Sequence, residues 1–258
     1  MREFILFGIE NRIATITLNR PEKRNALNPQ LVAELQSAFK QAESDPAVKV
    51  VILKSSANTF SAGADLAYLQ QLQSNTYQQN LDDSIRLKML FSTIYNLDKP
   101  VIAQVEGNAI AGGCGLATVC DVIFASPEAI FGYTEVKIGF IPALVATFLL
   151  RRIGEGRTRE LLLSGELITA ETALKYGLIN FIEEKNAIAD AVKAYAETLV
   201  KNISSQSIKA TKELLVKIQH LSVDDALNYA ARANARARLN GDCKKGIDAF
   251  LNKKHPKW

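Results

Sequence analysis

Apolar residues in the first half of the chain fall into short runs that are typical of strands, separated by segments with helical spacing. Two β-rich runs, at 4–7 and 13–18, flank the segment 8–12 and predict a hairpin. The run 48–53 is almost continuously apolar, which is typical of a strand covered on both faces. The chain therefore begins as a mixed α/β protein.

A helix with clear boundary residues is predicted between these strands. Asn28 can cap its first turn, and Pro29 suits its first position because that amide has no helical acceptor. One helical face is apolar, formed by Leu31, Leu35, Ala38, Phe39 and Ala42. We expect that face to pack on the sheet.

The same order of elements then repeats. The polar loop 54–65 leads into a helical region that ends near residue 97. A strand at 101–105 is followed by the glycine-rich run 107–115, which starts another helix, and by a strand at 121–124. Strands that alternate with helices imply crossover connections and a mainly parallel sheet.

Strand signals nearly vanish after about Pro142, and helical patterns take over. The helical segments predicted there are 145–162, 169–176, 186–201, 204–219, 223–239 and 241–251. Ser222 and Asp225 form a capping-box-like start for an alanine- and arginine-rich helix, whose small residues favour close packing against a neighbour. We expect a core over residues 1–195 and a helical region over 196–258.

Composition places the chain among soluble globular proteins. Of its 258 residues, 48% are hydrophobic and 22% charged, which excludes a disordered chain. The net charge is +4, and the basic residues are scattered except at the tail. The sequence therefore lacks the basic stretch with interleaved aromatics that is typical of a nucleic-acid binder. The three cysteines, at 114, 120 and 243, lack metal-ligand spacing and are expected to be buried thiols.

The sequence contains no pattern for export or for membrane insertion. The N-terminal apolar run is too short for a signal peptide, and no run reaches the ~18 apolar residues that a membrane span requires. A cytoplasmic location is therefore expected.

The glycine-rich run between Gly107 and Gly115 predicts an anion site. Glycines allow a ligand to approach main-chain amides, and a helix that begins there adds the positive end of its dipole. The run matches neither a dinucleotide fingerprint nor a phosphate-binding loop, which excludes nucleotide-dependent redox chemistry. His220 and His255 both lie far along the chain from this run, so neither a Ser-His-Asp triad nor a histidine metal site is indicated.

Five segments together carry a family resemblance. They are 18–27 (LNRPEKRNAL), 60–65 (FSAGAD), 111–114 (AGGC), 120–121 (CD) and 131–142 (FGYTEVKIGFIP). With this order and spacing, nearly the whole chain resembles the enoyl-CoA hydratase/isomerase, or crotonase, family. Within that family, the sequences of these motifs most resemble those of bacterial methylglutaconyl-CoA hydratase-like members, which act in leucine breakdown. The resemblance implies a spiral of ββα repeats with a helical C-terminal trimerisation region, assembled as a homotrimer or hexamer.

The resemblance also implies the site residues. The backbone amides of Ala64 and Gly112 would hold the thioester carbonyl of an acyl-CoA, and Glu135 would move protons on the acyl chain. Burial beside apolar side chains should raise the pKa of Glu135. Coenzyme A would arrive as part of the substrate, with no separate cofactor or metal. The positions that match CoA contacts in relatives are Lys23, Arg24, Ala62, Asp65, Leu66, Phe250 and Lys253.

Two departures from the family pattern bear on the reaction. Gly115 stands where hydratases usually carry a second glutamate, which puts two-carboxylate hydration in doubt. Ala143, Leu144 and Val145 would fill space that glycines leave open in relatives, and they indicate either a reshaped acyl pocket or a better-packed helix start. We expect an enoyl-CoA hydratase-type lyase, acting on a short branched or carboxylated enoyl-CoA, with double-bond isomerisation by Glu135 alone as the alternative.

A function of another class also fits the sequence. One crotonase-like protein is known for RNA recognition, and the lysines of the C-terminal tail permit such a role here. RNA affinity that persists at raised salt would distinguish it, because nonspecific phosphate contacts weaken steeply with salt.

Overall fold

The computed structural model describes residues 2–256 and 258. Its main sheet has the strand order β1-β2-β3-β5-β7-β10, in which β1 and β2 are antiparallel and the remaining neighbours are parallel. The strands are β1 (Ile5–Glu10), β2 (Ile13–Leu18), β3 (Val50–Ser55), β5 (Val101–Val105), β7 (Val122–Ala125) and β10 (Phe181–Ile182). The predicted parallel sheet with an N-terminal hairpin is confirmed.

The hairpin turn is tighter than the sequence suggested. Gly8 and Glu10 belong to strand β1, and only Asn11 and Arg12 form the turn, both with positive φ angles. Two successive residues with φ > 0 are typical of a type I′ turn, whose twist matches that of the flanking strands. The predicted segment 8–12 was therefore too long.

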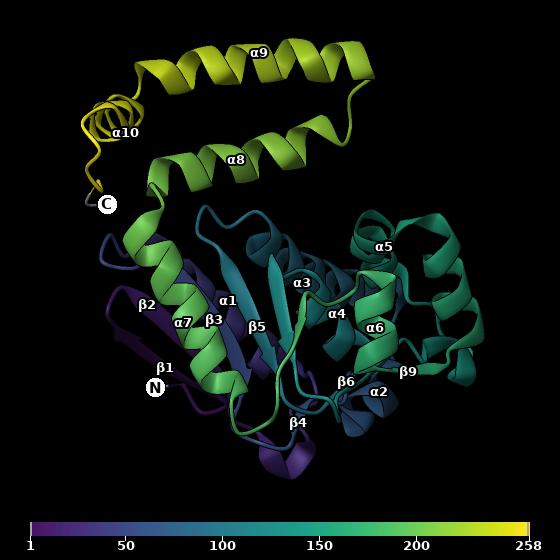
Figure 1. Cartoon of the computed structure of the whole chain (residues 1–258). Coiled ribbons are helices and arrows are strands. Elements are labelled where there is room, and N and C mark those ends of the chain that lie inside the picture. The colour runs from purple at the N-terminus through teal and green to yellow at the C-terminus, as the bar shows by residue number, and fades with distance from the viewer. Residues whose placement is uncertain (1, 257) are drawn as a thin grey trace.

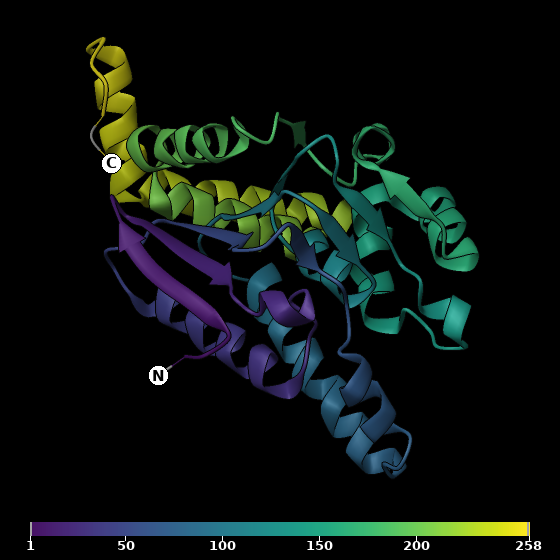
Figure 2. The same cartoon turned by 90° about the horizontal axis from the view of Figure 1, so that it is seen from below.

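Helices cover both faces of the main sheet, as Figures 1 and 2 show. Val51 and Leu53 of β3 face the core shared with α1 (Pro29–Ser44) and α3 (Tyr77–Tyr95). Val50 and Ile52 face the smaller core beneath α7 (Ile188–Asn202). Because successive side chains of a strand point to opposite faces, the continuous apolar run at 48–53 follows from this double cover.

A second, smaller sheet has the order β4-β6-β8-β9. Its strands are β4 (Thr59–Ser61), β6 (Asn108–Ile110), β8 (Ile130–Gly132) and β9 (Leu167–Thr169), of which the first three are parallel. The sequence predicted none of these strands. Each has three residues, too few for an alternating pattern to be recognised.

Further helices connect the two sheets and extend beyond them. They are η1 (Pro21–Lys23), α2 (Leu66–Leu72), α4 (Gly112–Thr118), η2 (Glu135–Ile138), α5 (Ala143–Ser164) and α6 (Ala170–Tyr176). Helix α5 is interrupted at Gly154, where φ is +74°. The amide of Leu31 donates to Asn28 Oδ1 at 2.8 Å, so the predicted cap of α1 is confirmed.

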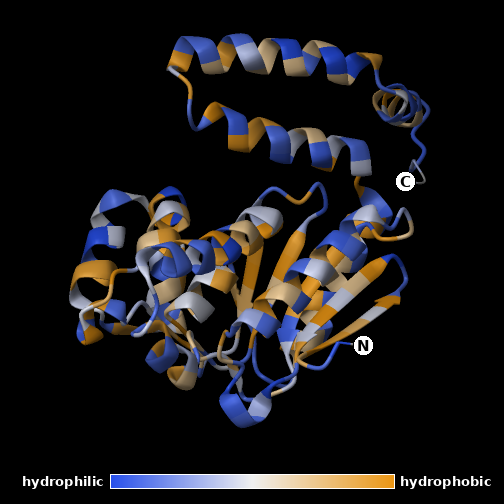
Figure 3. Ribbon diagram, turned by 180° about the vertical axis from the view of Figure 1, so that it is seen from behind, coloured by the Kyte–Doolittle hydropathy of each residue, from blue (hydrophilic) through white to orange (hydrophobic). Residues whose placement is uncertain are grey.

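The C-terminal helices α8 (Ser205–Ile218), α9 (Val223–Leu239) and α10 (Gly241–Leu251) form a separate layer. Figure 1 shows α8 and α9 as a hairpin above the core, and none of the residues in the three helices is buried. Figure 3 shows hydrophobic and hydrophilic residues interspersed along them. The predicted boundary at residue 195 falls inside α7, whose last core contact is Val200.

The thiols differ in their surroundings. Cys114 and Cys120 are buried and unpaired, and burial raises the pKa of each to about 12. Cys243 is only half-buried, because it lies in the C-terminal layer, so the expectation of three buried thiols was wrong for it.

No helix among the described residues is both long and apolar enough to cross a membrane.

Candidate functional site

Three neighbouring strands of the small sheet end at one edge, and the predicted site residues follow them directly. Ala64 comes three residues after β4, Gly112 two residues after β6 and Glu135 three residues after β8. Because β4, β6 and β8 are parallel neighbours, their carboxyl ends lie side by side. Ligands of parallel sheets typically bind outside this edge.

The amide of Ala64 is directed away from the chain segment that holds it. Leu27 forms a parallel bridge with Ala64, in which the Leu27 amide donates to Gly63 O at 2.6 Å and the Asp65 amide donates to Leu27 O at 2.9 Å. In such a bridge the amide of the central residue points to the opposite side. Within the described residues, no acceptor for the Ala64 amide is recorded.

Gly63 brings this segment against the start of α4. Its φ is +87°, in the region that favours glycine. A methyl group at Gly63 would lie 2.9 Å from Ile110 O and 3.6 Å from the Gly112 nitrogen. Only a residue without a side chain allows the two backbones to approach this closely.

Gly112 is the first residue of α4, where the amide has no acceptor within the helix. Ala111 before it has φ +50° and ψ −124°, a conformation that a non-glycine residue rarely adopts. Its amide donates to Gly132 O at 2.7 Å, which ties the turn to β8. Backbone strain of this kind costs on the order of 1–3 kcal/mol and is frequent at functional sites.

Gly113 sets the separation between α4 and β4. A methyl group at Gly113 would lie 2.4 Å from the backbone oxygen of Ser61. We predict that Gly113→Ala destabilises the protein by about 1–3 kcal/mol and lowers kcat/KM, because α4 must move away from β4. Urea unfolding and steady-state kinetics would measure both effects.

Gly156→Ala is the matched control for this substitution. A methyl group at Gly156, in α5, would have no neighbour within 4 Å, so we expect unchanged or slightly higher stability. Equal stability of the two variants would contradict the role given to Gly113.

The surroundings of Glu135 favour the protonated form of its carboxylate. Burial raises its pKa above the ordinary value of 4.5, although a hydrogen bond from its own backbone amide partly opposes this. Its Oε2 atom is buried and has no hydrogen-bond partner among the described residues. An unpaired carboxylate oxygen of raised pKa can both accept and return a proton near neutral pH.

The position of the absent second glutamate is already filled. A methyl group at Gly115 would lie 2.3 Å from Val145 Cγ1 and 3.2 Å from Phe91 Cζ. Val145 is 4% exposed and Phe91 is fully buried. Of the three residues predicted to fill space in the acyl pocket, Ala143 is exposed, Leu144 is half-buried and Val145 is buried, so Val145 is the one that fills space over α4.

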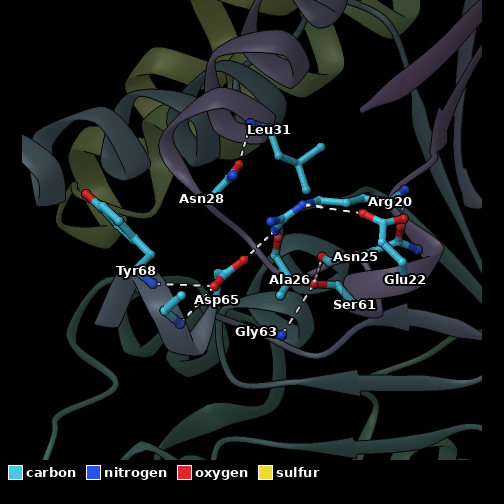
Figure 4. Close-up of polar contacts among 11 residues, drawn as sticks. Arg20, Glu22, Asn25, Ala26, Asn28, Leu31, Ser61, Gly63, Asp65 and Tyr68 are labelled. Carbon is cyan, nitrogen blue, oxygen red and sulfur yellow. Dashed lines mark hydrogen bonds and ion pairs between the residues drawn. The ribbon is translucent and has the colours of Figure 1, made fainter. Parts of the chain in front are cut away.

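A buried ion pair supports the segment that carries Ala64 (Figure 4). Arg20 Nη1 lies 2.6 Å from Asp65 Oδ2 and donates to Ala26 O at 3.0 Å. Asp65 in turn caps α2 by accepting from the amides of Ala67 and Tyr68. Burial favours the neutral acid, but the hydrogen bonds from Arg20 and these amides outweigh it and lower the pKa of Asp65.

Asn25 connects the same region to the small sheet. Its side-chain amide donates to the carbonyls of Thr59 and Phe60 at 3.1 Å, and its backbone oxygen accepts from Ser61 Oγ at 2.8 Å. The Asn25 side chain also accepts from the Arg20 amide at 2.8 Å. The loop after β2 is thereby bound to β4, next to the Ala64 amide.

The structure separates the predicted CoA contacts into two groups. Lys23, Arg24 and Leu66 are exposed and Ala62 is half-buried, all within the loops that flank Ala64. Asp65 belongs to the same segment, but its carboxylate pairs with Arg20 and caps α2. Phe250 belongs to α10 and Lys253 follows that helix; Figure 1 shows α10 in the C-terminal layer, away from α2, the helix that begins at Leu66.

Comparison with known proteins agrees with this fold. The family model described as "Enoyl-CoA hydratase/isomerase" matches residues 8–258. A Thermus thermophilus relative, named as a candidate enoyl-CoA hydratase, is 41% identical over 249 residues, which cover 96% of this chain and 98% of the relative. The (E)-benzylidenesuccinyl-CoA hydratase of Thauera aromatica is 32% identical over 258 residues, covering 98% and 97%.

A solved structure shows the same architecture. The crystal structure of an enoyl-CoA hydratase from Shewanella pealeana matches with a TM-score of 0.94 and 28% identity, over 100% of this chain and 96% of that one. The fold is thus the crotonase fold. The chain belongs to the enoyl-CoA hydratase/isomerase family, whose members are enzymes that act on acyl-CoA substrates.

Proposed function

We propose that this enzyme binds an enoyl-CoA, holds the thioester oxygen with the amides of Ala64 and Gly112, and transfers protons through Glu135. The observation that carries the proposal is the buried Oε2 of Glu135, which follows the same sheet edge as the amides of Ala64 and Gly112, with no hydrogen-bond partner for any of the three among the described residues. Two such amides stabilise the negative charge that develops on the thioester oxygen when an enolate forms. No cofactor beyond the coenzyme A of the substrate is needed for these steps.

Double-bond isomerisation is the reaction that the geometry favours. A single carboxylate suffices to remove a proton from one carbon and to return it to another. The space over Gly115, from which a second carboxylate would project, is taken by Val145 and Phe91. Glu135 with its free oxygen therefore meets the requirement of this reaction by itself.

Hydration is the second candidate, and the named relatives favour it. Both the Thermus thermophilus relative and the Thauera aromatica enzyme carry hydratase names, and the latter's name specifies a succinyl-CoA derivative. In hydration, hydroxide adds to one alkene carbon and a proton to the other, with Glu135 relaying the proton. A short branched or carboxylated enoyl-CoA is the proposed substrate in this case, since a substrate carboxylate could orient the water.

The conjugated thioester absorbance distinguishes the two reactions. Incubation with 3-hexenoyl-CoA should increase this absorbance through isomerisation, whereas hydration of crotonyl-CoA or methylglutaconyl-CoA should decrease it. No change with any of the three substrates would contradict the proposed function.

The pH dependence of kcat/KM provides an independent check. Glu135 must be ionised to accept a proton, and burial raises its pKa above 4.5. We therefore expect activity to fall as the pH is lowered through a midpoint above 4.5, while a solvent-exposed carboxylate would give a midpoint near that value. The acid limb should disappear from the residual activity of Glu135→Gln.

A homotrimer or hexamer is the proposed assembly. The C-terminal layer buries none of its helical residues, yet it carries large apolar side chains that are each more than half exposed: Leu215, Val223, Leu227, Leu239, Ile247, Phe250 and Leu251. Surfaces of this kind usually mark contacts with another chain. In such an assembly, Phe250 and Lys253 would contact the CoA site of a neighbouring subunit. Sedimentation equilibrium would measure the number of subunits.

A further inference from the structure

Val145 of α5 lies against Gly115 of α4. Gly115 lies on α4, one turn after Gly112, and is fully buried. Val145 is in the first turn of α5, which packs against both α4 and the η2 turn that begins with Glu135. Val145 thus lies against the helix that carries one proposed oxyanion amide, and its own helix also packs against the turn that carries the acid.

The side chain of Val145 has little freedom to move aside. It is 4% exposed, and a β-branched residue in a helix is restricted to few rotamers. Phe91 of α3 closes the same space, and its ring is fixed edge-on against Phe148, with centroids 6.2 Å apart. A side chain at position 115 would have to displace this packing.

From this geometry, and resting on the proposed function, we propose that Val145 is a reaction-specificity residue. It fills the space over Gly115 that a second acid and its bound water would need, and so leaves proton transfer to Glu135. The site is then restricted to isomerisation, with hydration suppressed.

The isomerisation step balances with Glu135 alone. Its carboxylate takes a proton from the α carbon of a 3-enoyl-CoA, and the electron pair of that C–H bond moves onto the thioester oxygen to form a dienolate. The resulting carboxylic acid returns the proton to the γ carbon, and the double bond shifts from the β,γ to the α,β position. No atom is gained or lost, and the carboxylate is regenerated.

The test compares hydration of crotonyl-CoA with isomerisation of 3-hexenoyl-CoA in four proteins: wild type, Val145→Ala, the double variant Gly115→Glu/Val145→Ala, and Val192→Ala. Val192 is fully buried in α7, in the separate core on the other face of the main sheet, and so controls for loss of a buried valine. Circular dichroism and thermal unfolding establish that each variant is folded.

We expect the ratio of hydration to isomerisation to rise several-fold in Val145→Ala and at least about tenfold in the double variant, because a general acid or base typically contributes 10²–10⁴-fold. Val192→Ala should keep the wild-type ratio. An unchanged ratio in folded Val145→Ala would overturn the inference, as would a wild type that mainly hydrates crotonyl-CoA. A wild type inactive on both substrates would instead contradict the proposed function itself.

Discussion

Glu135→Gln should reduce turnover by about 10²–10⁴-fold while binding of butyryl-CoA stays within a few-fold of wild type. The amide side chain keeps the size of the glutamate but cannot accept and return a proton. The proposed main-chain contacts from Ala64 and Gly112 do not involve this side chain. Steady-state kinetics and calorimetric titration with butyryl-CoA would measure the two effects separately.

The same variant should not be less stable. Burial raises the pKa of Glu135 in the folded protein, so ionisation disfavours the folded state at every pH above the unfolded value of 4.5. Replacing the carboxylate removes this cost, and we expect an unfolding temperature at pH 7 that is equal or higher. Catalytic groups are often retained at such a cost in stability.

Glu166→Gln is the matched control for the kinetic prediction. Its carboxylate is 70% exposed and pairs with Lys137 at 3.0 Å, on the surface. Its removal should change turnover less than twofold, since exposed pairs contribute roughly 0–1 kcal/mol. Turnover of Glu135→Gln within tenfold of wild type would show that another group transfers the proton.

Arg20→Leu should cost about 3 kcal/mol of folding stability and lower kcat. Removing one partner of a buried ion pair leaves the other charge unpaired, which typically costs 3–5 kcal/mol. The side chains of Arg20 and Asp65 are only 10% and 8% exposed. We expect the loss of folding stability to be near the lower value because a polar cavity of about 600 Å³ lies beside the pair. Turnover should fall because Asp65 follows Ala64 directly.

The stability difference should depend on pH in a defined direction. The pKa of Asp65 is lowered in the fold, so the pair stabilises the protein above the unfolded value of 3.8 and loses this effect as the pH falls below it. In Arg20→Leu, the Asp65 carboxylate lacks its arginine partner, and its protonation on acidification removes the cost of the unpaired charge. The difference between the two proteins, measured by urea unfolding, should therefore be largest near neutral pH and narrow on acidification.

Arg86→Leu separates this effect from the loss of any arginine. Arg86 is 56% exposed and lies 3.7 Å from Asp83 in the same region of the molecule. We expect it to lose less than about 1 kcal/mol. If Arg20→Leu were equally mild, the Arg20–Asp65 pair would not support the Ala64 segment.

Long elements were predictable because their patterns are local. The apolar face of α1, its Asn28 cap and the continuous apolar run of β3 each depend on residues within a few positions of one another. The start of α9 at Ser222 is likewise local, and its hydroxyl accepts from the Asp225 amide at 3.2 Å. Three-residue strands such as β4 carry too little pattern to be recognised.

The candidate site was predictable only where a motif marks it. Ala64, Gly112 and Glu135 stand in segments that resemble the family, and the structure places them after adjacent strands. The role of Arg20 was not predicted, although it stands in a family motif, and Val145 was expected to fill space in the acyl pocket but not to lie against Gly115. Their partners, Asp65 and Gly115, lie far from them in sequence, so no local signal connects them.

By itself the sequence determined the order of the long helices and of the first five strands of the main sheet, the family, and the presence of a single glutamate at position 135, since these follow from local periodicity and motifs. Only the tertiary structure decided what that glutamate can do. Burial raises its pKa and leaves one oxygen without a hydrogen-bond partner in the part of the chain that the structure describes, while Val145 and Phe91 occupy the space over Gly115. Desolvation and excluded volume arise between segments distant in the chain, and therefore exist only once it is folded.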